Sequence, residues 1–173
     1  LVMSAQHTLA SRLDEIQAGI HYLKTITGVD NIVLATAPDA LHGFGEIGAN
    51  VVAVDAAYPS GLPRLVVQKV LGEEIPNDKC FEDMGVSFFT AEAIASIGRA
   101  FTEKQLPLEK TITLIDKAGN RSLVSARIGT PIADILKEHN IGLEEKDRII
   151  LGGPMTGHSI FSAHYPVQPN TDA

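Results

Sequence analysis

Cysteine is almost absent from this sequence, since Cys80 is the only one among its 173 residues. The chain therefore has no internal disulfide, and it cannot alone supply the thiolates of an iron–sulfur cluster or a cysteine-based zinc site. Cys80 lies in the polar stretch "NDKCFED", where no neighbouring histidine could activate a thiol. We interpret it as a small side chain and not as a catalytic nucleophile.

Long apolar runs and an excess of positive charge are also missing. No run approaches the about 20 apolar residues of a membrane-spanning helix. The start, "LVMSAQHTLASRL", lacks the charged front, apolar middle and cleavage site of a signal peptide. The net charge of -7 disfavours general binding to nucleic acid. We therefore expect neither a direct membrane span nor a nucleic-acid partner.

Apolar residues make up 45% of the chain and recur with clear periodicity, so a buried core is expected. From Leu9 to Ile26 they follow one helical face, and Gly28 is placed to end that helix. Strands are predicted in "NIVLAT", "NVVAVDA" and "MGVSFF", and helices in "LPRLVVQKVLG" and in "TAEAIASIGRAF", which Thr90 would cap. This alternation predicts a Rossmann-like, layered α/β domain with a parallel sheet.

The pattern changes near Pro107. The stretch "KTITLIDKAGNRSLVSARIG" predicts a hairpin, "TPIADILKEHN" a helix with Thr130 as N-cap and Pro131 in its first position, and "DRIIL" a strand. Hairpin, helix and strand in this order are typical of a small α+β unit of the β-grasp type. We therefore predict two domains, covering residues 1–106 and 107–173.

Three motifs could carry function. "GFGEIG" (Gly43 to Gly48) fits the dinucleotide-binding pattern, but a strand follows it where that mechanism needs a helix, which disfavours a dehydrogenase. His158 and His164 flank "SIFSA", and surface histidines are the preferred interpretation over a metal site. "LGGPMTG" is either a ligand or partner surface or a tight turn with a bulge.

Several stretches together resemble the C subunit of the Rnf electron-transport complex. They occur in the family's order and cover essentially the whole chain: "LASRLDEIQAGIHYLKTITGV", "YPSGLPRLVVQKVLGEEIP", "DMGVSFFTAEAIASIGRAF", "RIGTPIADIL" and "IILGGPMTG". The resemblance implies that residues 1–106 are the later part of a domain shared with the flavin subunit of complex I. Residues 107–173 would form a soluble-ligand-binding β-grasp (SLBB) domain.

The resemblance also implies a function for a longer protein. That protein would move electrons between NADH or a flavin and iron–sulfur clusters, as a cytoplasmic subunit held peripherally at the inner face of the cell membrane by other subunits of a redox complex. FMN and two [4Fe–4S] clusters would be its cofactors. The present chain is expected to be an internal fragment that binds neither cofactor and catalyses nothing alone.

Tyr58 and Gly61 match the family's "YPxG" turn and are the candidate FMN-facing residues. Other positions depart from the family, because Pro63 and Arg64 stand where it has Glu and Lys, and Phe89 and Thr90 fall within its "NNVGT" stretch. Losing amide partners for a buried polar ligand costs about 1–3 kcal/mol each. The alternative function is therefore a non-catalytic binding or scaffold module with a degenerate flavin site.

Two further groups of residues receive structural interpretations. One is the glycine-rich loop, which would shape the surface of the β-grasp unit, and the other is the entry to the helix that follows the hairpin. The members are Gly152, Gly153, Pro154 and Gly157 for the loop, and Gly129, Thr130 and Pro131 for the helix entry.

Overall fold

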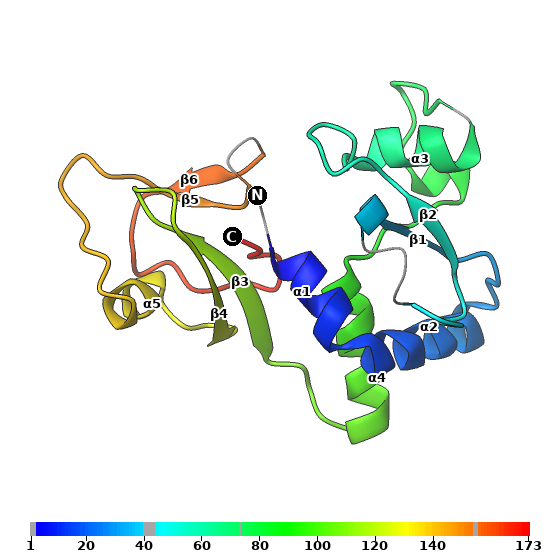
Figure 1. Ribbon diagram of the computed structural model, residues 1–173, viewed down its shortest axis with the longest axis horizontal. Coiled ribbons are helices and arrows are strands. Elements are labelled where there is room, and N and C mark those ends of the chain that lie inside the picture. The colour runs from blue at the N-terminus through cyan, green and yellow to red at the C-terminus, as the bar shows by residue number, and fades with distance from the viewer. Residues whose placement is uncertain (1–2, 40–43, 73, 154–155) are drawn as a thin grey trace. The chain divides into compact units, whose positions relative to one another are not determined.

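The computed structural model describes residues 3–39, 44–72, 74–153 and 156–173 (Figure 1). It divides into two compact units. One unit is Leu9–Gln105, and the other is Leu106–Ala173 together with the first residues of the chain through Thr8. Both units combine helices with short two-stranded sheets, in agreement with the mixed α/β class. The sequence did not indicate that the first residues pack with the C-terminal unit.

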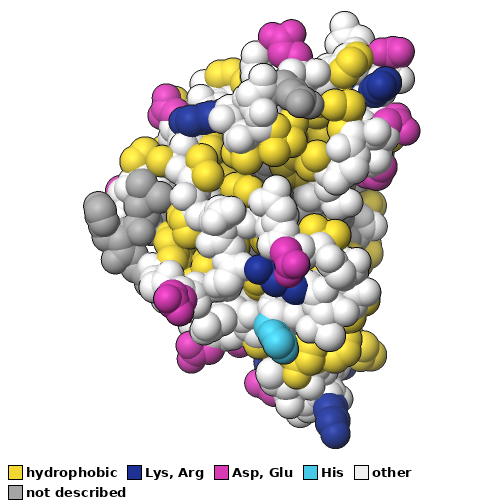
Figure 2. Space-filling model, turned by 90° about the vertical axis from the view of Figure 1, so that its right-hand side faces the viewer, with side chains coloured by type: hydrophobic (Ala, Val, Ile, Leu, Met, Phe, Trp, Pro, Cys, Tyr) yellow, Lys and Arg dark blue, Asp and Glu magenta, His cyan; other side chains and the backbone are white. Residues whose placement is uncertain are grey.

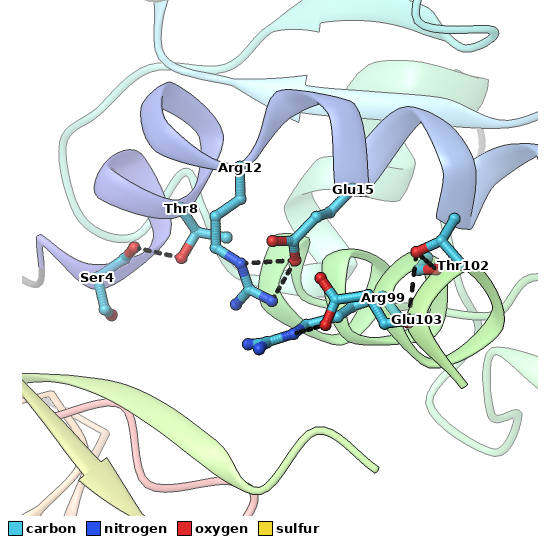
Figure 3. Close-up of polar contacts among 8 residues, drawn as sticks. Ser4, Thr8, Arg12, Glu15, Arg99, Thr102 and Glu103 are labelled. Atoms are coloured by element: carbon cyan, nitrogen blue, oxygen red, sulfur yellow. Dashed lines mark hydrogen bonds and ion pairs between the residues drawn. The ribbon is translucent and has the colours of Figure 1, made fainter. Parts of the chain in front are cut away.

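The first predicted helix is in fact two helices, α1 (Ser4–Ser11) and α2 (Leu13–Thr27). Arg12 separates them with a non-helical backbone (φ -127°, ψ 33°), so the prediction of one continuous helix is wrong. The Arg12 Nε atom donates to Glu15 Oε2 at 2.8 Å, which holds the residue at the break against the first turn of α2 (Figure 3). Gly28 ends α2 as predicted, with φ 70° and an N–H bond to Lys24.

Strands β1 (Val33–Thr36) and β2 (Asn50–Ala53) pair in parallel, as the alternation of elements predicts. Helices α3 (Pro63–Leu71) and α4 (Ala91–Glu103) follow, separated by a short 3-10 turn, Glu82–Met84. The buried core of this unit draws on α1, α2, α4 and the β1–β2 connection, through Leu9, Ile16, Ile20, Phe44, Ile47 and Ala95.

The third strand predicted at residues 84–89 does not form. Instead, Gly85 adopts φ 70° and the Val86 N–H bonds back to the Phe81 carbonyl, closing a local turn. Phe88 and Phe89 remain 41% and 52% exposed. The apolar composition of this stretch therefore reflects exposed aromatic side chains and not a buried strand.

Helices α2 and α4 pack against each other through their backbones (Figure 1). A Cβ atom on Gly19 would lie 2.0 Å from the Ile94 carbonyl oxygen, and one on Gly98 would lie 1.9 Å from the Glu15 carbonyl oxygen. Both distances are far inside van der Waals contact, so each position requires glycine. Beside the contact, Thr102 Oγ1 donates to the Gly98 carbonyl at 2.9 Å (Figure 3).

The second unit contains two antiparallel pairs and one helix. Strands β3 (Glu109–Ile115) and β4 (Arg121–Arg127) form the predicted hairpin, with Gly119 at its tip in the left-handed region (φ 83°). Helix α5 (Ile132–Glu138) follows, and then β5 (Ile149–Leu151) pairs with β6 (His158–Ile160). The buried residues are Ile112, Val124, Ala126, Ile132, Ile135, Leu136, Leu151 and Val167.

The start of α5 differs by one residue from the prediction. Pro131 is the N-cap, with no side-chain cap bond, so the assignment of Thr130 as cap is wrong. The Thr130 carbonyl accepts instead from the Val167 N–H at 2.8 Å, because the segment before the C-terminus runs alongside this helix entry. Gly129, in turn, has φ 97° and donates its N–H to the Val167 carbonyl. The three residues thus form a structural turn.

Both ends of the chain bind to β3. The Thr113 hydroxyl accepts from the backbone N–H groups of Met3 and Ser4 at 2.9 and 3.1 Å. The Thr113 N–H donates to the Asp172 carbonyl at 2.9 Å. Lys110, whose side chain is 6% exposed, places Nζ 2.8 Å from Asp172 Oδ1. The N-terminal residues and the C-terminal tail therefore complete this unit.

Candidate functional site

The candidate flavin-facing turn follows β2 and leads into α3. The Asp55 carboxylate accepts from the Ala57 N–H at 3.1 Å, and the Ser60 N–H donates to the Ala57 carbonyl at 3.0 Å. The Tyr58–Pro59 peptide is cis. This turn lies at the carboxyl end of a parallel strand, which is where layered α/β sheets place their ligands.

Tyr58 and Gly61 lie on the surface of this turn. The Tyr58 side chain is 58% exposed, and a Cβ atom on Gly61 would meet no atom within 4 Å. Gly61 also lacks a left-handed φ, so the fold itself does not require glycine there. The two residues thus offer an accessible aromatic ring and unobstructed backbone, and neither lines the open cavity that is described below.

Two positions next to this turn have structural roles. Pro63 is the first residue of α3, where its missing N–H costs no helical hydrogen bond. The Arg64 guanidinium donates to the carbonyls of Ile75 and Lys79 at 2.9 and 3.5 Å. Arg64 therefore holds the loop after α3 in place, and its donors are engaged by the protein itself.

Phe89 and Thr90 offer little to a polar ligand. The Thr90 hydroxyl accepts from the Ala93 N–H at 3.1 Å, so it serves as the N-cap of α4, as predicted. Phe89 has no hydrogen-bonding atom in its side chain. Together with Pro63, these residues do not fit a site that binds the polar tail of a flavin.

The glycine motif "GFGEIG" connects β1 to β2, and its first residue, Gly43, lies outside the described residues. Phe44 and Ile47 are 8% and 2% exposed and belong to the core. An open cavity of about 470 Å³ borders the loop, lined by Lys24, Asp30 and Glu46 among others. It lies at the amino ends of both strands, and its charges are of both signs, so it does not fit a dinucleotide pyrophosphate.

The loop between β5 and β6 is a tight turn. The N–H groups of Thr156 and Gly157 both donate to the Gly153 carbonyl, and Gly152 has φ 98°. A Cβ atom on Gly157 would lie 2.6 Å from the Leu151 carbonyl oxygen. These contacts favour the tight-turn alternative for "LGGPMTG"; Pro154 lies outside the described residues.

The metal-binding interpretation of the histidines gains no support. His158 lies in β6 and His164 in the following segment, and both are exposed. Across the described ranges, no group of three or more His, Cys, Asp or Glu side chains is arranged to hold a metal ion.

Cys80 is exposed and its thiol is hydrogen-bonded to Asp83 Oδ2 at 3.1 Å. This bond to a carboxylate raises the pKa of the Cys80 thiol, and the pKa of Asp83 is lowered by its bonds to the Cys80 N–H and thiol. A raised pKa keeps the thiol protonated, whereas a nucleophile needs the thiolate. The hydrogen bond to Asp83 therefore lowers the thiolate fraction of Cys80 near neutral pH.

The surface of the α/β unit carries exposed apolar side chains with charges of both signs among them (Figure 2). Tyr58, Leu65, Leu71, Phe88 and Phe89 are among the exposed apolar residues. Within the part of the chain that the structure describes, no helix has the length and apolarity to cross a membrane.

No protein-family model matches the chain. The chain does match curated proteins. Three of these relatives are each named as the C subunit of an ion-translocating oxidoreductase complex. The protein from Pasteurella multocida is 26% identical over 168 residues, which is 92% of this chain and 20% of the relative. That from Yersinia pseudotuberculosis is 26% identical over 163 residues, 89% of this chain and 23% of the relative. A Haemophilus influenzae protein is 28% identical over 168 residues, 92% of this chain and 26% of the relative.

The chain thus spans about a fifth to a quarter of the length of these relatives. The similarity nevertheless extends over about nine tenths of the chain itself. The resemblance predicted from the five sequence stretches is therefore confirmed: this chain is similar, almost from end to end, to one portion of the C subunit of ion-translocating oxidoreductase complexes.

Proposed function

We propose that this chain is part of an electron-transfer subunit of an ion-translocating redox complex. In the longer protein, electrons would pass between NADH or a flavin and iron–sulfur clusters. The observation that carries the proposal is the similarity to the C subunits from three organisms over 89–92% of the chain. The other subunits of such a complex would be its partners, and it would lie peripherally at the cytoplasmic face of the cell membrane.

We further propose the domain assignment for the two parts of the chain. The parallel β1–β2 pair with helices on either side in sequence supports a Rossmann-like, flavin-subunit-like domain in residues 1–106. The hairpin, helix and second strand pair support a β-grasp SLBB domain in residues 107–173. In this assignment the first residues of the chain, through Thr8, pack with the SLBB domain although they precede the flavin-subunit-like domain in sequence.

The cofactors of the longer protein would be held mainly by other segments. A single cysteine cannot ligate two [4Fe–4S] clusters. Tyr58 and Gly61 would contribute one side of an FMN site, where the exposed ring packs against the flavin and the unobstructed glycine lets it approach the backbone. FMN, when bound, would supply one- and two-electron chemistry.

A second candidate function is a binding or scaffold module that has lost the flavin. Three observations favour it: Pro63 begins α3 where a carboxylate would be expected, Phe89 lacks a polar atom, and the Thr90 hydroxyl is already used as a helix cap. In this case the β-grasp unit would dock a partner protein without electron transfer.

The test compares FMN binding by this chain and by the longer natural protein. The chain alone should not quench flavin fluorescence; saturable binding with a Kd below about 1 μM would contradict the incomplete site. The longer protein should purify with flavin and cluster absorbance. A colourless longer protein that still assembles with its partners would support the scaffold function.

Two substitutions in the longer protein test the turn directly. Tyr58→Ala should weaken FMN binding by about tenfold or more, since stacking on an aromatic ring is worth about 1–3 kcal/mol. Gly61→Ala adds a methyl group that meets nothing in this chain, so reduced FMN binding at unchanged thermal stability would place the ligand at that backbone. If neither variant changes FMN binding, the turn does not face the flavin.

A further inference from the structure

The loop between α3 and α4 folds back against α3. The Arg64 guanidinium, on the first turn of α3, donates to the carbonyls of Ile75 and Lys79 at 2.9 and 3.5 Å. One turn later, Gln68 Nε2 donates to Glu74 Oε1 at 2.9 Å. Because residues four apart lie on the same side of a helix, this side of α3 and the loop form one continuous surface.

The later part of the loop is held by an aromatic pair. The Phe81 ring packs edge-to-face against Phe88 with 4.8 Å between the ring centroids, and the Val86 N–H donates to the Phe81 carbonyl at 2.9 Å. Phe81 is partly buried, whereas Phe88 and Phe89 are 41% and 52% exposed. These contacts thus fix the Phe88 ring in place without covering it.

Large apolar side chains of α3 add to this exposed area. Leu65 is 37% exposed and Leu71 is 45% exposed. Figure 2 shows apolar side chains gathered toward its top, at the end of the unit that carries α3 (Figure 1). Exposed apolar groups that gather in one area mark interaction sites, whereas singly scattered ones do not. The α3–loop surface is defined here by Leu65, Leu71, Phe88, Phe89 and the charged loop residues between 74 and 83.

Acidic side chains predominate in the loop beside these aromatic rings. From residue 74 to residue 83 the charged side chains are all exposed, and they comprise Lys79 and the acids Glu74, Asp78, Glu82 and Asp83. Asp83 accepts from the Cys80 N–H at 3.0 Å, and its bonds to Cys80 lower the pKa of its carboxyl, so it is ionised at neutral pH. Counting Arg64, which binds the loop carbonyls, four acids still stand against two bases. The α3–loop surface therefore combines exposed apolar area with an excess of negative charge.

We propose that the α3–loop surface docks a basic segment of a partner protein, one that carries Lys or Arg beside apolar side chains. The apolar side chains of that segment would pack on Phe88 and Phe89, and its cations would lie beside the loop carboxylates. The charge selects this occupant, because a second copy of the chain, a nucleic acid or an anionic lipid surface would bring like charges together. The inference does not depend on flavin binding or electron transfer.

The first experiment uses two synthetic peptides as probes. Both are amphipathic helices of about 14 residues with the same leucine positions, and the remaining positions are lysine in one peptide and glutamate in the other. Each peptide is titrated into the isotope-labelled full chain and followed by amide NMR shifts. The lysine peptide should shift amides of residues 65–89, and the glutamate peptide should not. A lysine peptide that leaves these amides unshifted, or equal shifts with both peptides, would overturn the proposal.

Substitutions separate the apolar and the charged contributions to binding of the lysine peptide. Phe88→Ser should weaken it about tenfold or more, because a central aromatic contact is lost. Asp78→Asn combined with Glu82→Gln changes no apolar side chain and should weaken it about threefold or more, a difference that shrinks at high salt. The matched controls are Ile26→Ser, at a side chain on α2 that is 64% exposed, and Glu138→Gln on α5. Equal losses in the controls would contradict a site at the α3–loop surface.

The second experiment identifies the partner of the longer natural protein. A photo-reactive benzophenone amino acid replaces Phe88, the protein is irradiated together with its natural partners, and the cross-linked peptide is sequenced. The product should come from another protein and contain more Lys and Arg than Asp and Glu. A product from a second copy, from an acidic segment or from a lipid would overturn the proposal, and so would the absence of any product.

Discussion

Gly19 and Gly98 lie where α2 and α4 pack so closely that neither position has room for a Cβ atom. Each lies within a helix, where alanine is ordinarily better than glycine by about 1 kcal/mol. Here the missing Cβ lets the backbones of α2 and α4 touch, and the steric cost of adding one exceeds the helical gain. Nothing in the periodicity of the two helices distinguishes these glycines from ordinary interior residues.

We therefore expect Gly98→Ala to destabilise the protein by about 1–3 kcal/mol, as overpacking usually does. Chemical denaturation measures this. Gly142→Ala is the matched control, because its added Cβ meets no atom within 4 Å and its φ is not left-handed. The free energy of unfolding of that variant should differ from that of the unsubstituted protein by less than about 0.5 kcal/mol. Equal stabilities of the two variants would contradict the close backbone contact.

A second prediction at this scale concerns the reactivity of Cys80. The bond to Asp83 raises the thiol pKa, so the thiolate is scarce near neutral pH. Asp83→Asn should lower the thiol pKa and speed alkylation by iodoacetamide at pH 8. The pH dependence of the alkylation rate gives the pKa directly. Unchanged rates would show that the carboxylate does not govern this thiol.

At the scale of elements, the sequence predicts well where local signals are strong. Gly28 and Gly72 both end their helices with left-handed φ, and the hairpin around Gly119 follows directly from its turn residues. The prediction of secondary structure fails where contacts between distant segments determine the backbone conformation. Residues 84–89 are apolar enough for a strand but close a local turn, and α1 and α2 share one apolar periodicity across a break at Arg12.

In the candidate site too, local sequence signals predict some features, and contacts between distant segments determine the others. Its location in a strand-to-helix turn could be predicted, because Tyr58 and Gly61 follow a clear strand pattern. The use of Arg64 by the carbonyls of Ile75 and Lys79 could not, since the bonds depend on how the loop folds back over α3. The contact of Asp172 with β3 spans 59 residues from Thr113, and no local pattern reports it.

The N-cap of α4 yields the next prediction. Thr90→Ala removes the acceptor for the Ala93 N–H and should destabilise the protein by about 1 kcal/mol. Thr90→Ser keeps the hydroxyl and should retain most of the stability. Thermal unfolding of both variants checks this. A Ser variant as unstable as the Ala variant would mean that the methyl group, and not the cap bond, matters.

The β3–β4 hairpin should respond to acid. The Asn120 side chain and N–H bond to Asp116 and hold the pKa of its carboxyl below the usual 3.8. The stabilisation is present above that value and is lost as the pH falls through the lower folded-state pKa. NMR titration of the Asp116 carboxyl should show this pKa rising in Asn120→Ala. An unchanged pKa would rule out Asn120 as its cause.

At the scale of the whole molecule, the C-terminal unit takes residues from both ends of the chain. Met3, Ser4 and Asp172 all bond to Thr113, which is 1% exposed. A division of the chain into two consecutive halves would therefore separate residues 3–8 from the unit in which they pack. Sequence patterns indicate consecutive domains, because they contain no information on which distant segments meet.

Thr113→Val tests this arrangement. The variant keeps the side-chain size but removes the hydroxyl that accepts from two backbone N–H groups, at an expected cost of about 1–3 kcal/mol. Hydrogen exchange should accelerate at Met3 and Ser4. Thr25→Val, which removes an exposed hydroxyl on α2, is the control and should leave both amides unchanged. Protected amides at Met3 and Ser4 in Thr113→Val would contradict the proposed role.

The lone thiol has a practical consequence. Cys80 is exposed and is the only cysteine in the sequence. A fluorophore or spin label can therefore be attached at one defined point without replacing other cysteines. The neighbouring Phe81 packs edge-to-face on Phe88 at 4.8 Å. A label there would report on the loop between α3 and α4, next to the exposed aromatic residues, as flavin or partner proteins are titrated in.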